Sequence, residues 1–193
     1  KRLLALDISG VYYSISSSRV YAYGALASQV IGFTSIDGVG QSGIELLYDD
    51  VLSGENGQIL TQTDLLGIEI EDSVTYIKNG VDGLDVELTL SYEIQSIAEN
   101  ALKRAMIAYT PKSASAVVMD VNSGEILAMA SLPSLDLNDL PRDDLSSLFS
   151  LSRNRLITDI YEPGSTFKVL TASMNLEEYK NGNPKAFFPE HVF

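Results

Sequence analysis

Ser165 and Lys168 are the residues of this sequence best suited to chemistry, because they lie three positions apart just after Pro163-Gly164. Proline fixes φ and lacks an N–H, so it is tolerated at a helix entrance, and we expect a helix to open near Ser165. Side chains three positions apart share one helix face, which brings the serine hydroxyl within reach of the lysine amine. A serine becomes a nucleophile when a base takes its proton, and a buried lysine beside other donors can have its pKa lowered enough to be that base. The pair therefore predicts a nucleophilic serine with a lysine general base.

The residues after Ser165 favour such a helix, since they are rich in apolar side chains as far as Tyr179 and a stop follows at Asn181-Gly182. The helix N-terminus would place a partial positive charge where an acyl oxyanion develops. The spacing also has an ordinary explanation, because S-x-x-K arises by chance on solvated helix faces and in caps. On these residues alone, both interpretations stay open.

Composition narrows the classes of function. The 193 residues carry a formal net charge of −13 with Lys and Arg scattered, so we expect no nucleic-acid binding, which needs a basic patch. The same acidity disfavours a membrane surface bound through basic residues. There is no Cys and a single His, His191, so we expect no disulfide framework, no structural zinc and no cofactor.

The first residues of the chain are not interpreted as a signal peptide. Lys1 to Leu6 imitates the start of a signal peptide, but Asp7 interrupts the apolar run. No run of about 18 apolar residues occurs, so no membrane span is expected within these residues. The chain begins without Met and stops soon after the expected serine helix, which indicates a fragment of a longer protein.

The first 80 residues are rich in strand and turn signals. Residues 10–23 alternate as a half-buried strand pair, a short helix is expected around Leu26 to Val30, and a second should open near Ser42 after a glycine-rich turn. That turn lacks G-x-x-x-x-G-K-[ST] and its neighbours are acidic, so it is not interpreted as a phosphate loop. Residues 58–78 favour β structure, with Gly67 at a bulge or turn.

After the turns around Gly80, where we place a domain boundary, the pattern changes. Residues 84–90 alternate strictly, which predicts a strand with one covered face. A helix should begin after its N-cap Ser91, with an i,i+4 pair between Glu99 and Lys103. Its apolar stripe would contain Ile94, Ile97, Ala98, Ala101, Leu102, Ala105 and Met106.

Residues 115–131 predict a hairpin that turns at Ser123-Gly124, and its near-continuous apolar runs indicate a sheet covered on both faces. Residues 133–158 show few periodic signals and are expected to be a solvated loop. Asp139, Asp143 and Asp144 cluster there, and a solvated loop is preferred over a metal site or an acid/base pair.

Several stretches resemble the class B penicillin-binding proteins, the cell-wall transpeptidases. Tyr161-Glu162-Pro163-Gly164-Ser165-Thr166-Phe167-Lys168, preceded by Asn154-Arg155 and Thr158-Asp159, is similar to their active-serine segment. Residues 21–33, followed by Gly43-Ile44-Glu45, resemble the family's pedestal, often called its dimerisation domain. The hairpin with Ser131-Leu132-Pro133 is also similar, although Leu137 stands where Asp136 to Asn138 would usually have a proline.

The resemblance implies an α+β protein. A β-rich extended pedestal would cover residues 1–80, and residues 81–193 would begin a penicillin-binding, serine β-lactamase-like transpeptidase domain in the order helix, β-hairpin, active-serine helix. Ser165 would be the nucleophile and Lys168 the base. The family's S-x-N and K-[ST]-G motifs should lie downstream. Ser173-Met174-Asn175 imitates the first but would lie on the serine's own helix, and Lys180-Asn181-Gly182 is better explained as that helix's end.

By this resemblance, the whole protein would be a penicillin-sensitive peptidoglycan D,D-transpeptidase of the division or sporulation type that works through an acyl-serine. It would act outside a bacterial cell membrane, anchored by a span not present in this chain. Its partners would be D-Ala-D-Ala stem peptides, β-lactams and membrane proteins of cell-wall synthesis such as a glycosyltransferase, and a homodimer is a further candidate assembly. The 193 residues alone are expected to be inactive or nearly so. The alternatives are a non-catalytic scaffold that binds such partners, and a β-lactamase or penicillin sensor, against which residues 20–80 speak.

Overall fold

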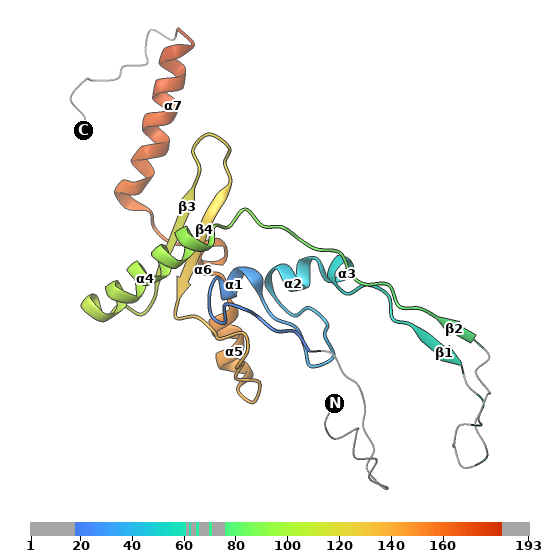
Figure 1. The fold of residues 1–193 in the computed structure, drawn as a ribbon. Helices are drawn as coiled ribbons and strands as arrows, with labels where there is room; N and C mark the ends of the chain where they lie inside the picture. Colours follow the sequence, from blue (N-terminus) through green and yellow to red (C-terminus); the bar gives the residue numbers. More distant parts are fainter. Residues whose placement is uncertain (1–17, 61, 63–64, 66–69, 71–75, 183–193) are drawn as a thin grey trace. The chain divides into compact units, whose positions relative to one another are not determined.

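The computed structural model describes residues 18–60, 62, 65, 70 and 76–182, which form two compact units, one ending at Thr158 and the other beginning at Asp159 (Figure 1). Helices and small antiparallel sheets alternate along the chain, so the expected α+β class is confirmed. Most of the strand pair expected over residues 10–23 lies outside the described residues, as do Gly67 and His191. The described part of that pair, residues 18–23, contains no strand.

The first described segment consists of turns and short helices. Turns over residues 22–27 lead into α1 (Ser28–Ile31), α2 (Gly43–Leu47) and α3 (Asp49–Leu52). The helix expected around Leu26 to Val30 is confirmed with its start at Ser28, and Ser42 is the N-cap of α2 as expected. The sequence does not predict α3 as a separate helix, since Tyr48 alone separates it from α2.

The glycine-rich turn between α1 and α2 brings two backbones into direct contact. Gly32 has a φ of 78°, and a Cβ there would lie 1.9 Å from the carbonyl oxygen of Ser42. Gly43 has a φ of 57°, and its Cβ would lie 2.4 Å from the carbonyl oxygen of Val30. Only a residue without a Cβ permits both the conformation and the contact. Backbone packing therefore accounts for these glycines without a bound ligand.

Replacing Gly32 with alanine is expected to destabilise this segment far more than replacing Gly38. Both glycines have positive φ, 78° and 84°, so each alanine should cost about 1–2 kcal/mol in backbone strain. At Gly38 no atom lies within 4 Å of the Cβ position, whereas at Gly32 the new methyl group collides with Ser42. Urea denaturation followed by circular dichroism would give both losses in free energy of unfolding. Equal losses would contradict the steric role of Gly32.

A second short sheet follows the helices. β1 (Gln58–Leu60) pairs antiparallel with β2 (Tyr76–Lys78), which confirms β structure at the described ends of residues 58–78. Glu55 and Val81 extend the pairing as a bridge, their N–H groups donating to each other's carbonyls at 2.8 and 2.9 Å. Lys78 Nζ also lies 2.8 Å from the Glu55 carboxylate.

The strand predicted over residues 84–90 does not form, since these residues have no ladder partner in the described part of the chain. The alternation is nevertheless seen in burial: Val86, Leu88 and Leu90 are half-buried, while Glu87 and Thr89 are exposed. A period of two reports which side chains are covered, whereas a strand also needs a partner for its backbone. The prediction of a covered face is correct and that of a strand is wrong.

The long helix α4 (Tyr92–Tyr109) begins as predicted, because the Ser91 side chain accepts a hydrogen bond from the Ile94 N–H. Its buried face is rotated from the predicted stripe. Ile97 is 67% exposed, whereas Gln95 is 1% and Glu99 5% exposed. Ala98 packs on Ala128 and Ala130, so small side chains let the helix approach the hairpin closely. Hydrophobic spacing therefore locates the helix but misses the two polar residues at the centre of its buried face.

The predicted hairpin is confirmed as β3 (Ala114–Met119) paired antiparallel with β4 (Ile126–Leu132) (Figure 1). Gly124 has a φ of 79° in the connecting turn, as the Ser123-Gly124 signal requires. The expectation of a sheet covered on both faces is wrong for the described residues. β4 is largely buried, but Val117, Val118 and Met119 of β3 are exposed, because α4 packs chiefly on β4.

Residues 133–158 are not the solvated loop that was expected, since α5 (Leu145–Ser152) and α6 (Arg155–Thr158) lie within them. Leu148 of α5 is buried in a core with Phe33, Leu135 and Leu137. The apolar side chains of this stretch pack on the segment around Phe33, more than a hundred positions earlier in the chain, and a local pattern cannot show this. Asp139 and Asp143 are exposed, as expected of a loop, and Asp144 caps α5.

Asp144 is expected to make the start of α5 sensitive to acid. Its carboxylate accepts hydrogen bonds from the Ser147 hydroxyl and from the Ser147 N–H at 3.1 Å, and these bonds lower the pKa of Asp144. A lowered pKa means that the cap stabilises the fold above the ordinary value of 3.8 and is lost as pH falls through the folded value. The acid transition of Asp144→Asn, followed by circular dichroism, should therefore be shallower than that of the unmodified chain. Superimposable acid transitions would contradict this.

Candidate active site

Ser165 lies in a short 3₁₀ helix, η2 (Gly164–Phe167), that runs directly into α7 (Lys168–Lys180). The predicted helix is thus present, but its first turn is 3₁₀. Gly164 has a φ of 54°, which lets the chain turn sharply between Pro163 and Ser165. In a 3₁₀ turn residues three apart are eclipsed, so Ser165 and Lys168 lie on one face even more directly than in an α-helix. The Lys168 N–H donates to the carbonyls of Ser165 and Thr166 and continues the turn into α7.

The side chains of Ser165 and Lys168 are both exposed. Neither makes a hydrogen bond with the other or with any residue that the structure describes. Within the described residues, the two side chains therefore do not yet form a closed site. What the arrangement offers chemically is a hydroxyl and an amine on one face, at the N-terminal end of a helix.

Two stretches resemble the downstream motifs, Ser173-Met174-Asn175 and Lys180-Asn181-Gly182, and both lie in or at the end of the serine's own helix, as predicted. Ser173 and Asn175 are inside α7, and Ser173 Oγ donates to the carbonyl of Val169 at 2.8 Å. Lys180 ends α7, and Gly182 follows with a φ of 79°. Neither stretch can face Ser165 across a cleft.

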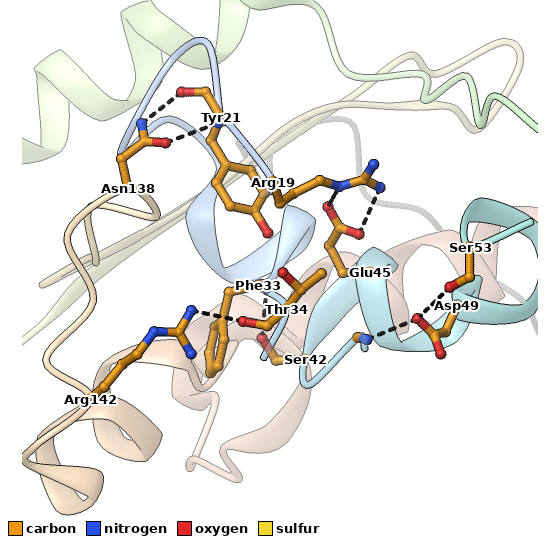
Figure 2. Close-up of polar contacts among 11 residues, drawn as sticks. Arg19, Tyr21, Phe33, Thr34, Ser42, Glu45, Asp49, Ser53, Asn138 and Arg142 are labelled. Carbon is orange, nitrogen blue, oxygen red and sulfur yellow. Dashed lines mark hydrogen bonds and ion pairs between the residues drawn. The ribbon is translucent and has the colours of Figure 1, made fainter. Parts of the chain in front are cut away.

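A polar cluster in the first segment, which the sequence analysis does not single out, ties α2 to the residues before α1 (Figure 2). Arg19 Nε and Nη2 donate to the two carboxylate oxygens of Glu45 at 2.7 and 2.8 Å. Only 8% of the Glu45 side chain is exposed. These hydrogen bonds raise the pKa of Arg19, partly opposed by burial. Burial, followed by the charge of Glu45, raises the pKa of Tyr21.

The same segment is fastened to residues that follow the hairpin. The Asn138 side chain accepts from the Tyr21 N–H at 3.0 Å and donates to the Tyr21 carbonyl at 2.8 Å, as Figure 2 shows. Arg142 Nη2 donates to the carbonyl of Thr34 at 2.9 Å. Leu137, the residue that departs from the family pattern, is 3% exposed in the core beneath these contacts. It is thus a packing residue and not merely part of a loop.

A buried polar network joins α1, α4 and β4. Glu99 Oε1 accepts from the N–H of Ala27 at 2.8 Å and from Gln95 Nε2 at 3.0 Å. The Gln95 amide in turn bonds both backbone groups of Met129. Lys103 Nζ lies 3.8 Å from the second Glu99 oxygen, so the expected i,i+4 pair is present at long range. These contacts make α4 the element on which the first segment and the hairpin meet.

No group of three or more His, Cys, Asp or Glu side chains among the described residues could hold a metal ion. No helix within these residues is both long and apolar enough to cross a membrane.

Comparisons with known proteins assign most of the chain. Residues 3–88 match the family model of the penicillin-binding protein dimerisation domain, and residues 114–187 match that of the penicillin-binding protein transpeptidase domain. Stage V sporulation protein D of Bacillus subtilis is 41% identical over 180 residues, which are 93% of this chain and 27% of that protein. Peptidoglycan D,D-transpeptidase FtsI of Escherichia coli is 34% identical over 172 residues, which are 89% of this chain and 28% of that protein. The chain thus spans about a quarter to a third of the curated relatives it matches.

Solved structures of penicillin-binding proteins and a peptidoglycan synthetase are also similar to this chain. A peptidoglycan synthetase from Bifidobacterium adolescentis superposes with a TM-score of 0.69 at 29% identity, covering 93% of this chain and 32% of that one. Penicillin-binding protein 3 of Mycobacterium tuberculosis, complexed with ampicillin, gives a TM-score of 0.65 at 29% identity, covering 86% of this chain and 32% of that one. The order of α4, the β3–β4 hairpin and the serine helix therefore belongs to a fold that these structures share.

Proposed function

The chain belongs to the class B penicillin-binding proteins, and from this we propose that it forms the pedestal and the nucleophile-bearing start of a peptidoglycan D,D-transpeptidase. One observation carries the proposal: Ser165 and Lys168 are eclipsed on η2 and α7, within the residues that match the transpeptidase model. Residues 1–80 are the pedestal and residues 81–193 the first part of the catalytic domain. The name of the Escherichia coli relative, peptidoglycan D,D-transpeptidase FtsI, supports the reaction class.

In the proposed reaction Ser165 Oγ attacks the carbonyl of the penultimate D-alanine of a stem peptide. Lys168 Nζ takes the hydroxyl proton, and that proton goes to the departing amine, so the terminal D-alanine leaves as the C–N bond breaks. An amine of a neighbouring strand then attacks the acyl-serine, forms the cross-link and releases Ser165. A β-lactam acylates the same oxygen by opening its ring. The Ser165 N–H would be one donor to the developing oxyanion, and a second must come from the edge strand that carries the K-[ST]-G motif.

In the proposed reaction some of the required groups come from the part of the domain that follows these residues. The 193 residues should therefore have little or no activity by themselves. The described part of the chain supplies one wall of the cleft and leaves Lys168 exposed. The resemblance places the S-x-N and K-[ST]-G motifs of the facing walls downstream of the serine helix, and Ser173-Met174-Asn175 lies within that helix. Without these walls Ser165 and Lys168 have no groups that hold a substrate against them, so no acyl transfer is expected.

The proposed setting is the outer face of a bacterial cell membrane, where peptidoglycan is built. The names of the relatives, which include a sporulation protein and FtsI, support a role in sporulation or division. The substrates would be D-Ala-D-Ala stem peptides, the inhibitors β-lactams, and the partners membrane proteins of wall synthesis such as a glycosyltransferase. The match to a dimerisation domain also favours a homodimer.

A chimeric protein tests this function. Residues 1–193 are fused to the remaining C-terminal part of the Bacillus subtilis sporulation protein, which is 41% identical over the shared region. The chimera should release D-alanine from a peptide ending in D-Ala-D-Ala, and the 193-residue chain should not. Absence of D-alanine release from a folded chimera, with the intact relative active in the same assay, would contradict the proposal.

The scaffold alternative rests on a different observation, the polar cluster around Arg19 and Glu45, which needs nothing from the serine helix to form. It predicts that Ser165→Ala leaves the binding of wall-synthesis partners unchanged while Glu45→Ala weakens it. The two functions are separable, because D-alanine release responds to the first substitution and a pedestal interaction only to the second.

A further inference from the structure

Three asparagines of the chain are followed directly by glycine, in the pairs Asn56-Gly57, Asn79-Gly80 and Asn181-Gly182. Such a pair is chemically labile, because the glycine nitrogen can attack the carboxamide carbon of the asparagine and no Cβ hinders its approach. The residues of all three pairs are exposed, so access of water does not distinguish them. The hydrogen bonding of the glycine N–H does.

The last pair is held by the helix before it. The Gly182 N–H donates to the carbonyl of Tyr179 at 3.1 Å. The Asn181 N–H donates to the carbonyl of Glu177 at 3.0 Å, so both residues close the final turn of α7. A backbone nitrogen whose proton is held in a hydrogen bond loses that proton less readily and is less free to turn toward the Asn181 side chain. This pair is therefore protected.

The other two pairs lie opposite each other, between two antiparallel contacts that keep one register. Glu55 and Val81 exchange both backbone hydrogen bonds, at 2.8 and 2.9 Å. Three positions further along, Gln58 is the partner of Lys78 in the β1–β2 ladder. The two Asn-Gly pairs between these contacts therefore face each other across the two chain segments.

The glycines of these two pairs direct their N–H groups differently. Successive residues of an antiparallel pair point their N–H groups alternately toward the partner segment and away from it. Val81 directs its N–H at Glu55, so its neighbour Gly80 directs its N–H away from that segment. Gly57, two positions after Glu55, directs its N–H toward the opposite segment. Among the residues that the structure describes, none accepts a hydrogen bond from the Gly80 N–H.

We propose that Asn79 is a site of spontaneous deamidation that reacts before the other two asparagines. The Gly80 nitrogen gives its proton to solvent hydroxide and attacks Cγ of Asn79. The carboxamide C–N bond breaks, ammonia leaves, and a cyclic imide forms. Water then opens the imide at one of its two carbonyls, which gives either aspartate or isoaspartate, whose main chain runs through Cβ. Water is the sole co-reactant, and the reaction does not depend on the proposed activity.

The isoaspartate product would change the contact between the two segments. It adds one atom to the main chain between Lys78 and Val81, so the β1–β2 ladder and the bridge to Glu55 cannot both keep their register. The packing leaves little room for the extra length, since a Cβ on Gly57 would already lie 2.9 Å from the Gly80 nitrogen. The aspartate product adds only a charge. We therefore expect isoaspartate, and not aspartate, to break the Glu55–Val81 bridge.

Peptide mapping of the folded 193-residue chain, incubated at neutral and at mildly alkaline pH, tests the site. Asn79 should convert several-fold faster than Asn56 or Asn181 and should yield both products. Its rate should rise with pH, because the attacking nitrogen is deprotonated. In urea, where the backbone contacts are lost, the three rates should become alike. Conversion of Asn56 or Asn181 as fast as Asn79 in the folded chain, or the same differences in urea, would overturn the proposal.

Two variants separate the site from its consequence. Asn79→Gln is the matched control, because its longer side chain must close a larger ring, and it should abolish conversion at this position while leaving that of Asn181 unchanged. Asn79→Asp imitates the product that adds charge alone. Hydrogen exchange should show the Val81 amide protected in Asn79→Asp and unprotected in the purified isoaspartate form. Equal protection in these two proteins would overturn the effect on the Glu55–Val81 bridge.

Discussion

Replacing Ser165 with alanine is expected to abolish covalent labelling of the chimera by penicillin. The acyl-enzyme is an ester of the serine oxygen, and alanine has no atom that can form it. Labelling is measured by exposing each protein to a fluorescent penicillin and separating it on a denaturing gel. The parent chimera should appear as one fluorescent band. Thr166→Ala is the neighbouring control, because the Thr166 hydroxyl is already engaged with the carbonyl of Pro163. It should keep most of the labelling, and a labelled Ser165→Ala protein would show that another residue is the nucleophile.

Lys168 is expected to act as the base, and its removal should slow acylation of the chimera by about 10³-fold. Lys168→Ala removes both the charge and the base, whereas Lys168→Arg keeps the charge and cannot give up its proton near neutral pH. If Lys168 takes the Ser165 proton, both variants should lose a similar factor in the rate of labelling, measured at several penicillin concentrations. A Lys168→Arg chimera with nearly the parent rate would mean that the residue contributes charge only.

Replacing Glu99 with alanine is expected to have the largest effect on stability of any substitution in the network of α4. Only 6% of its side chain is exposed, and one oxygen accepts from both Ala27 and Gln95. Removing the carboxylate leaves the buried Ala27 N–H and one N–H of the Gln95 amide without an acceptor, which should lower the free energy of unfolding by about 2–4 kcal/mol. The ion pair with Lys103 contributes little to this value, because the lysine is 54% exposed and 3.8 Å away.

Glu99→Gln separates the hydrogen bonds from the charge. Its amide oxygen can still accept from the Ala27 N–H, so this variant should lose less than half of what Glu99→Ala loses. Urea denaturation followed by circular dichroism measures both variants. Losses of the same size would mean that the carboxylate charge, and not the bonds to Ala27 and Gln95, stabilises the junction.

The turn and shared face of Ser165 and Lys168 could be predicted from the sequence because the signal is local. Pro163, Gly164 and the three-residue spacing of Ser165 and Lys168 each act on adjacent residues, and the structure has the turn, the positive φ and the shared face. The roles of the two residues stay a prediction. The hairpin and the N-cap of α4 could be predicted for the same reason, because their signals also lie in adjacent residues.

What the sequence could not show are contacts between distant residues. Gln95 and Glu99 are polar residues on a helix and would be placed in water by any hydropathy rule, yet they are buried because Ala27 and Met129 supply partners. Residues 84–90 alternate like a strand and find no partner strand. The stretch that contains α5 looked like a loop because the core that Leu148 enters is built largely from residues elsewhere in the chain.

Intact-mass spectrometry with and without excess penicillin tests most directly whether Ser165 is the nucleophile. The chimera should gain the mass of one penicillin, and peptide mapping should place it on Ser165. The 193-residue chain should stay at 21.0 kDa, because the rest of the cleft is needed to activate the serine. An adduct at any other residue of the chimera would contradict the assignment of Ser165. A stoichiometric adduct on the 193-residue chain would contradict the need for the facing walls.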